Sequence, residues 1–100
     1  MEAIVRTYTG KGASELFDLL EKHKADVEKA ITSVKGVESY TLVRSSDGDG
    51  GMSVTVGQDK TSIEESARTA KEWIAHNAGS IGAGAPKVFA GTVIIHATKR

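Results

Sequence analysis

The stretch KVFAGTVIIHA, residues 87–97, decides the fold, because it predicts a final strand that is apolar on both faces. Successive residues of a strand point to opposite sides of the sheet. Val88 and Ala90 therefore lie on one face of the predicted strand, and Phe89 and Ile95 lie on the other. At about 25 cal/mol per Å² of apolar surface, leaving either face in water would forfeit several kcal/mol, comparable to the stability of a small domain. The strand therefore needs a cover on each side.

The remaining patterns predict three more strands and two helices. β-Branched and aromatic residues indicate strands at 3–9, 37–44 and 52–56, and apolar residues at helical spacing indicate helices at 14–35 and 61–78. This order, with right-handed crossovers, predicts a four-stranded antiparallel sheet with two helices on one face. We therefore expect a single α+β domain over residues 1–100, in the ferredoxin-like βαββαβ arrangement.

The helix ends carry recognisable capping residues. Ser14 precedes the first apolar helical residue, so its hydroxyl is expected to cap the first helix, and Gly36 is expected to follow its end. The second helix is expected to begin with a capping box, formed either by Ser62 and Glu65 or by Thr61 and Glu64.

The doubly apolar last strand also predicts a partner. Two helices on one side of the sheet leave the other side bare, and a second sheet is the simplest cover for it. A symmetric pair of identical chains provides that cover through one self-complementary surface. We therefore expect a homodimer that forms through the sheet face opposite the helices.

Composition limits the classes of partner. The 13 basic and 13 acidic residues balance, which argues against general nucleic-acid binding, since that requires a basic face. No apolar run is long enough to span a bilayer, and no secretory signal precedes the first strand. Cysteine is absent, which excludes disulfides and thiolate chemistry. We expect a cytoplasmic protein that binds neither nucleic acid nor membrane.

The chain resembles the dimeric α/β-barrel superfamily, in particular its antibiotic-biosynthesis-monooxygenase-like branch. The resemblance lies in IVRTYTGKG at 4–12, VKGV at 34–37, and SYTLVRS at 39–45 before the DG turn at 47–48. It covers the element order of nearly the whole chain and specifies a fold more than an activity. It implies a small-ligand protein or a cofactor-independent monooxygenase with an aromatic substrate.

The chain departs from that family where chemistry is concerned. The family often carries an acidic residue and a tryptophan near the end of strand three, where this chain has VTVGQD at 54–59. Haem-degrading relatives use an asparagine on strand one, which is absent here, and Trp73 and His76 stand three residues apart on one helix. We expect no haem, no other cofactor and, since no metal-ligand spacing is present, no metal.

His23 and Tyr40 are the candidate catalytic residues. On a helical wheel His23 falls within the apolar stripe, where it would act as a proton acceptor or simply fill space as a satisfied, partly buried histidine. Tyr40 would donate a hydrogen bond to the ligand. Trp73 and Asn77 flank the stripe of the second helix and are candidate ligand-binding residues, Trp73 as a stacking wall or as the edge of the core.

Strand residues complete the candidate site. Arg6 and Tyr8 share one face of strand one, and Tyr40 and Arg44 share one face of strand two. They would line a cavity for an anionic or phenolic ligand, or else lie at the rim of a dimer interface, where Tyr and Arg are enriched.

Two functions of different class follow. The first is a small-molecule binding protein or cofactor-independent enzyme with its ligand between the helices and the sheet. The second is a non-enzymatic dimeric module, stress-related or regulatory, without a substrate. A cavity between the helices and the sheet separates them, because a space filled by side chains contradicts the first.

Overall fold

The computed structural model describes residues 1–99 of the chain. In that range it has four strands and three helices in the order β1 (Glu2–Tyr8), α1 (Ala13–Lys22), α2 (Lys24–Thr32), β2 (Val37–Arg44), β3 (Gly51–Gly57), α3 (Lys60–Ala78) and β4 (Lys87–Thr92). No helix in the described part of the chain is both long and apolar enough to cross a membrane.

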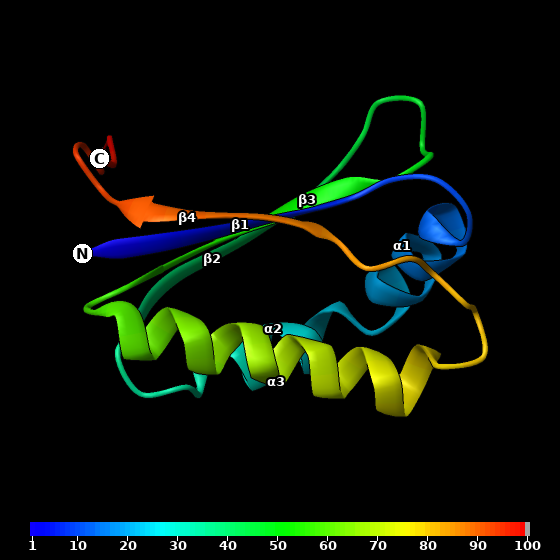
Figure 1. The fold of residues 1–100 in the computed structure, drawn as a ribbon, viewed down its shortest axis with the longest axis horizontal. Coiled ribbons are helices and arrows are strands. Elements are labelled where there is room, and N and C mark those ends of the chain that lie inside the picture. Colours follow the sequence, from blue (N-terminus) through cyan, green and yellow to red (C-terminus); the bar gives the residue numbers. More distant parts are fainter. Residues whose placement is uncertain (100) are drawn as a thin grey trace.

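The four strands form one antiparallel sheet in the order β2-β3-β1-β4, with the helices on one side of it (Figure 1). The pairing aligns Arg6 of β1 with Ser53 of β3 and with Val88 of β4. Buried residues alternate along β1, so that Ile4, Arg6 and Tyr8 face the helices. The predicted α+β, ferredoxin-like fold is confirmed.

The core lies between the helices and the sheet. Leu16 and Phe17 of α1 and Ile31 of α2 are almost fully buried, and the Phe17 ring meets the Tyr8 ring edge-on with centroids 6.0 Å apart. Gly51 opposite Tyr8 leaves space for this ring pair, since a Cβ there would lie 2.5 Å from Cε2 of Phe17. The packing of α1 against the start of β3 thus depends on glycine, which has no side chain, at position 51.

The prediction of one long helix over 14–35 is wrong, because the helix breaks at His23. The backbone of His23 (φ −112°, ψ 27°) separates α1 from α2, although hydrogen bonds from His23 N to Leu19 O and from Val27 N to His23 O continue past the break. The two helices point in different directions (Figure 1). His23 therefore lies at a junction, half-buried, and not within a continuous apolar stripe.

Both predicted N-caps are corrected. The residue before α1 is Gly12, whose φ of 82° lies in the left-handed region, and Ser14 is already inside the helix. The residue before α3 is Asp59, whose carboxylate accepts hydrogen bonds from the backbone N–H of Ser62 (2.8 Å) and from its hydroxyl (2.7 Å). A carboxylate accepts both bonds at once, and it favours the positive end of the helix dipole.

The last strand is shorter than predicted. β4 ends at Thr92, and a final hydrogen bond from Val93 N to Met1 O (3.0 Å) keeps the next residue beside β1. The apolar side chains of β4 are exposed on both faces, Val88 by 59% and Phe89 by 73%, because the helices cover the other three strands and leave this edge strand bare. The predicted need for a cover on each side is therefore not met within one chain.

Candidate functional site

Arg6 is the central polar residue of the helix-facing side of the sheet. It lies in the middle of β1, is only 8% exposed, and donates from Nη1 to the carbonyl of Ala67 in α3 (3.2 Å). Its Nε donates a longer bond to the hydroxyl of Ser53 (3.5 Å), and its guanidinium lies 5.7 Å from the centre of the Tyr8 ring. A strand position thus holds this cation between the sheet and α3.

The Arg6 guanidinium has no carboxylate partner among residues 1–99. The ion pairs in this part of the chain join other cations to Asp and Glu side chains, mostly on exposed helix surfaces. A buried charge is costly unless it is paired, and a guanidinium has five N–H donors of which two are engaged here. The remaining donors suit a planar anion such as a carboxylate or a phenolate.

Arg6 and Tyr8 form part of the wall of an open cleft of about 440 Å³, which we call the Arg6 cleft. Its other lining residues are Leu16 of α1, Ala67, Lys71, Ile74 and Ala75 of α3, the segment 83–86, and Val88 of β4. Ligand pockets for small organic molecules have volumes of about 300–1,000 Å³ and mostly apolar walls. The Arg6 cleft has both properties, with one exposed cation, Lys71, on its wall.

Two tyrosines flank Arg6. Burial raises the pKa of Tyr8, and the positive charge of Arg6 partly opposes that shift. Burial likewise raises the pKa of Tyr40 on β2, again with Arg6 acting in the opposite direction. Both phenols are therefore protonated near neutral pH, and each has an O–H that can donate a hydrogen bond to an anion.

The space beside Tyr40 and Trp73, where the sequence predicts the ligand, is filled by side chains. The cavity lined by Arg6, Tyr8, Tyr40 and Trp73 together with apolar residues has a volume of about 10 Å³. That is room for a single water molecule at most. The structure thus brings four of the seven predicted residues together, but the space that they share is too small for a ligand, and the room beside Arg6 lies on the α3 and β4 side.

His23 lies next to this group without lining either cavity. Its ring meets the Trp73 ring edge-on with centroids 6.1 Å apart, and its Nδ1 is 3.8 Å from the Asp26 carboxylate. Asn77 is exposed, and its amide donates to the carbonyl of Trp73 (2.9 Å), one turn earlier in α3.

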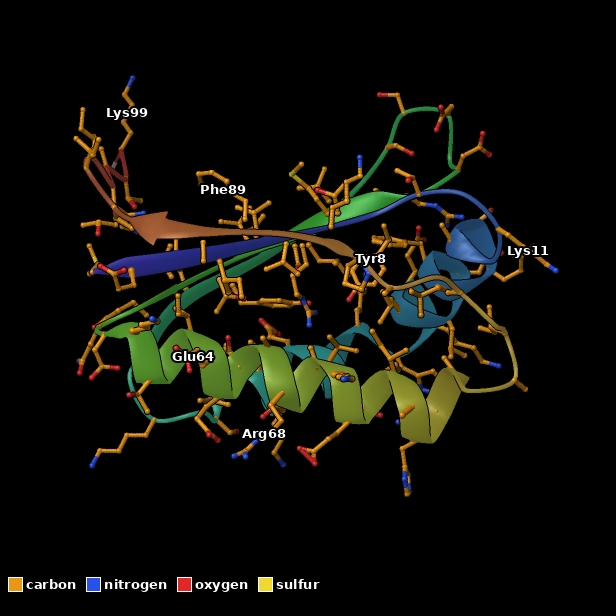
Figure 2. The ribbon with its side chains drawn as sticks, in the orientation of Figure 1. Tyr8, Lys11, Glu64, Arg68, Phe89 and Lys99 are labelled. Carbon is orange, nitrogen blue, oxygen red and sulfur yellow. The ribbon has the colours of Figure 1, made fainter. Side chains whose placement is uncertain are left out.

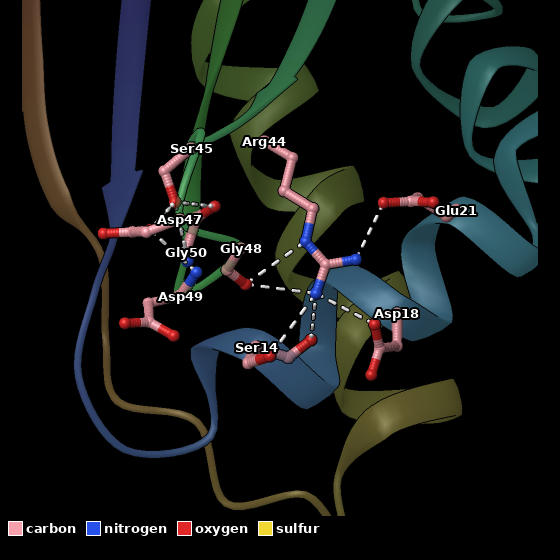
Figure 3. A network of polar contacts seen from close by, with 9 residues as sticks. All are labelled: Ser14, Asp18, Glu21, Arg44, Ser45, Asp47, Gly48, Asp49 and Gly50. Carbon is pink, nitrogen blue, oxygen red and sulfur yellow. Dashed lines mark hydrogen bonds and ion pairs between the residues drawn. The ribbon is translucent and has the colours of Figure 1, made fainter.

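Arg44 lies away from the Arg6 cleft and ties the hairpin loop to α1 (Figure 3). It forms ion pairs with Asp18 (2.8 Å) and Glu21 (2.7 Å) and donates to the carbonyl of Gly48 (3.1 and 3.2 Å) and to Ser14. Hydrogen bonds to the carboxylates of Glu21 and Asp18 raise the pKa of Arg44. Its donors are occupied by the chain itself, in contrast with those of Arg6.

Sequence reasoning missed the wall of the cleft formed by α3 and the segment 83–86. The alanine-rich stripe of α3 gave one signal, because Ala67 and Ala75 are small and leave a hollow between the helix and the sheet. The segment 83–86 gave none, since its position depends on contact of Ala83 with Gly12, where an added Cβ would lie 2.8 Å from Cα of Ala83. Among residues 1–99 no group of three His, Asp or Glu side chains is arranged to hold a metal ion.

No protein-family model and no curated protein matches the chain. Solved structures of the same fold do match. SnoaB from Streptomyces nogalater, described as a cofactor-independent oxygenase, is 17% identical, with 98% of this chain and 97% of SnoaB aligned and a TM-score of 0.65. A monooxygenase from the gene ActVA-Orf6 of Streptomyces coelicolor, solved with the ligand nanaomycin D, is 19% identical, with 99% and 91% aligned and a TM-score of 0.65.

A third match is a mutant of MhuD with two manganese protoporphyrin IX molecules bound per active site. It is 19% identical, with 98% of each chain aligned and a TM-score of 0.66. At such identities the likeness concerns the fold alone. Over nearly its whole length, this chain has the ferredoxin-like fold of these oxygenase and porphyrin-bound structures, as the resemblance drawn from its sequence implies.

Proposed function

We propose that this chain binds a small, flat organic anion in the Arg6 cleft. The observation that carries the proposal is a buried guanidinium without a carboxylate partner among residues 1–99, on the wall of a mostly apolar cleft of about 440 Å³. A ligand anion would supply the missing partner and would be desolvated together with Arg6, which strengthens their attraction.

Each part of the cleft has a role in this binding. The apolar side chains Ile74 and Val88 would contact the rings of the ligand, while Arg6 pairs with its carboxylate or phenolate oxygen. The protonated Tyr8 hydroxyl would donate a second hydrogen bond to the same anion. Lys71 would attract anions to the entrance, since it is exposed on the wall of the cleft.

A monooxygenase-like reaction is the finer form of this proposal. Structures with the same fold are described as a cofactor-independent oxygenase and as a monooxygenase, which supports an oxidative role. In a reaction without a cofactor the substrate itself supplies electrons to oxygen, and a phenolate supplies them more readily than a phenol. Arg6 would act by stabilising the phenolate form, as a fixed charge aimed at the anion.

Calorimetric titration with 1-hydroxy-2-naphthoate tests the binding proposal, with the uncharged 1-hydroxy-2-naphthamide as the matched ligand. We expect the anion to bind the wild type better than the amide, and Arg6→Met to weaken anion binding by about 10- to 100-fold, the usual value of a charged hydrogen bond. Arg68→Met is the matched control, because Arg68 lies on α3 outside the cleft and pairs with Glu65. Equal binding of the anion by the wild type and Arg6→Met contradicts the proposal.

Oxygen uptake tests the finer proposal separately. An oxygen electrode would record consumption of dissolved oxygen when 1-hydroxy-2-naphthoate is added to the wild type but not to Arg6→Met. Binding of the naphthoate without oxygen uptake retains the binding role and removes the oxidative role for this ligand.

The roles of His23 as proton acceptor and Tyr40 as hydrogen-bond donor stay predictions. Tyr40 is separated from the Arg6 cleft by the filled space around Trp73, and His23 lines neither cavity.

A function without any substrate is the second candidate, and the tight packing beside Tyr40 and Trp73 favours it. If neither the naphthoate nor a broader set of aromatic acids binds, the non-enzymatic module without a substrate is favoured.

We also propose that the chain is a homodimer in the cytoplasm. The exposed apolar side chains of β4 support self-association, and a chain without cysteine suits a reducing compartment. Size-exclusion chromatography with light scattering tests the dimer, and a monomer at micromolar concentration contradicts it.

A further inference from the structure

A second cation, Lys71 of α3, lies on the wall of the Arg6 cleft. Lys71 is exposed and forms no ion pair within residues 1–99. An acidic partner on the same helix would stand three or four residues away, and those positions hold Ala67, Arg68, Ile74 and Ala75. The charge of Lys71 is therefore not neutralised by its own helix.

The wall of the cleft has two cations and no carboxylate. Apart from Arg6, Lys71 and the phenol of Tyr8, the lining among residues 1–99 consists of apolar or small residues of α1, α3, β4 and the segment 83–86. A ligand with one acidic group would neutralise Arg6 and leave Lys71 to water. A ligand with two acidic groups would neutralise both cations, and the charge of the cleft is complementary to such a ligand.

Lys71 stands about one helical turn from the point where Arg6 contacts α3. Arg6 donates to the carbonyl of Ala67 (3.2 Å), and Lys71 follows Ala67 by four residues, a rise of about 6 Å along the helix. Helical side chains lean toward the N-terminus, which favours a Lys71 side chain directed back over the turn of Ala67. The two cations are thus placed to meet acidic groups roughly 5–10 Å apart, the separation across one or two aromatic rings.

The two cations differ in burial. Arg6 is 8% exposed between the sheet and α3, whereas Lys71 is exposed. Figure 2 shows Tyr8 on the helix side of the sheet and Arg68 on the side of α3 that faces away from the sheet, so Arg68 adds no third cation to the cleft. The cleft therefore has an inner end with a planar, desolvated guanidinium and an outer end with a flexible, hydrated ammonium.

We propose that the Arg6 cleft selects aromatic ligands with two acidic groups on opposite edges of the ring system, the inner group paired with Arg6 and the outer group with Lys71. This assignment rests on the proposed function and narrows its ligand class. Arg6 contributes most of the affinity, because its ion pair with the ligand is desolvated. Lys71 contributes a smaller increment in contact with water, and it is the residue that distinguishes diacids from monoacids.

Calorimetric titration with naphthalene-2,6-dicarboxylate and with its monomethyl ester tests this selection. The two ligands share the ring system and one carboxylate, and they differ in the charge at the opposite edge. We expect the wild type to bind the diacid about 6- to 10-fold better than the ester. About twofold arises because either carboxylate of the diacid can face Arg6, and about three- to fivefold is the upper part of the range for an exposed ion pair.

Variants of Lys71 assign the preference to this residue. Lys71→Met should reduce it to about twofold by weakening the diacid alone, because the ester forms no ion pair with Lys71. Lys71→Arg should retain the preference, since it restores the charge. Lys60→Met is the matched control, because Lys60 is a lysine of the same helix that lies outside the cleft and pairs with Glu64. Added salt should reduce the preference of the wild type, since exposed ion pairs are screened.

Failure of the selection and failure of the Arg6 cleft give different results. An equal preference in the wild type and Lys71→Met overturns the selection, as does an equal weakening of diacid and ester by Lys71→Met. In either case, ester binding that is lost in Arg6→Met retains the proposed function. If neither ligand binds the wild type, or if Arg6→Met binds both as well as the wild type does, the selection and the proposed function are both overturned.

Discussion

Replacing Arg6 by methionine should weaken ligand binding without unfolding the protein. Methionine is unbranched and flexible, so it fills the same narrow space between β1 and α3. The change removes the hydrogen bonds to Ala67 O and Ser53 and the contact with the Tyr8 ring. It also removes a buried charge that has no carboxylate partner among residues 1–99.

The interactions lost in Arg6→Met and the desolvation cost relieved by it contribute to the free energy of unfolding with similar size and opposite sign. The charged hydrogen bond to Ala67 O is worth about 1.5–3 kcal/mol, the bond to Ser53 at 3.5 Å contributes little, and the ring contact adds about 0.5–2 kcal/mol. Against them stands the desolvation of a guanidinium that is 8% exposed, which costs several kcal/mol. We therefore expect the free energy of unfolding of Arg6→Met to lie within about 1 kcal/mol of the wild type, or a Tm shift of no more than about 8 °C.

Leu16→Ala is the reference variant against which the stability of Arg6→Met is compared. Leu16 is fully buried and also lines the Arg6 cleft, but it contributes packing without charge, and its truncation should cost about 2–5 kcal/mol. Urea unfolding followed by circular dichroism measures both variants. If Arg6→Met is destabilised as much as Leu16→Ala, then Arg6 is a structural cation and is not held ready to pair with a ligand anion.

Three further changes have definite expected outcomes. Gly51→Ala should destabilise the fold by roughly 1–3 kcal/mol or more, because the new Cβ would lie 2.2 Å from the carbonyl of Val43 and 2.5 Å from Phe17, and a Tm equal to the wild type would contradict this. Hydrogen bonds from Ser62 lower the pKa of Asp59, so its contribution to stability is present above about pH 4 and is lost as the pH falls through the lowered pKa in the folded state. Urea titrations of Asp59→Asn and the wild type should therefore differ most at neutral pH and converge in acid, and a constant difference at all pH values would refute the charge effect. His23→Ala should leave naphthoate affinity in calorimetry unchanged, since His23 lines neither cavity, and a loss of binding would instead support its predicted role as proton acceptor.

The periodicity of the chain predicted the sheet and its helical cover, but not the break at His23. Leu20 and Val27 keep helical spacing across the break, so the apolar pattern is the same for one helix or two. Neither glycine nor proline marks the junction, and the change is in the backbone of a single residue. The N-cap of α3 was predicted wrongly for a similar local reason. Asp59 and Ser62 are both suitable N-cap residues, and only the geometry shows that the Asp59 carboxylate accepts the hydrogen bonds.

The candidate site was predicted in part. Alternation predicted that Arg6 and Tyr8 share one face of β1 and that Tyr40 and Arg44 share one face of β2, and in the structure Arg6, Tyr8 and Tyr40 line one small space with Trp73. It could not distinguish Arg6 from Arg44, since both are strand arginines facing the helices. The difference arises because α1 brings Asp18 and Glu21 to Arg44, whereas α3 brings only a backbone carbonyl to Arg6.

Residue order by itself determined the ferredoxin-like arrangement and the apolar character of the last strand, because side-chain alternation and helical spacing are properties of neighbours along the chain. The tertiary structure alone decided which arginine among residues 1–99 lies without a carboxylate partner, where a ligand has room, and that the side chains of Val88, Phe89 and Ile95 are exposed. Those features depend on distances between segments far apart in sequence, and no local pattern carries them.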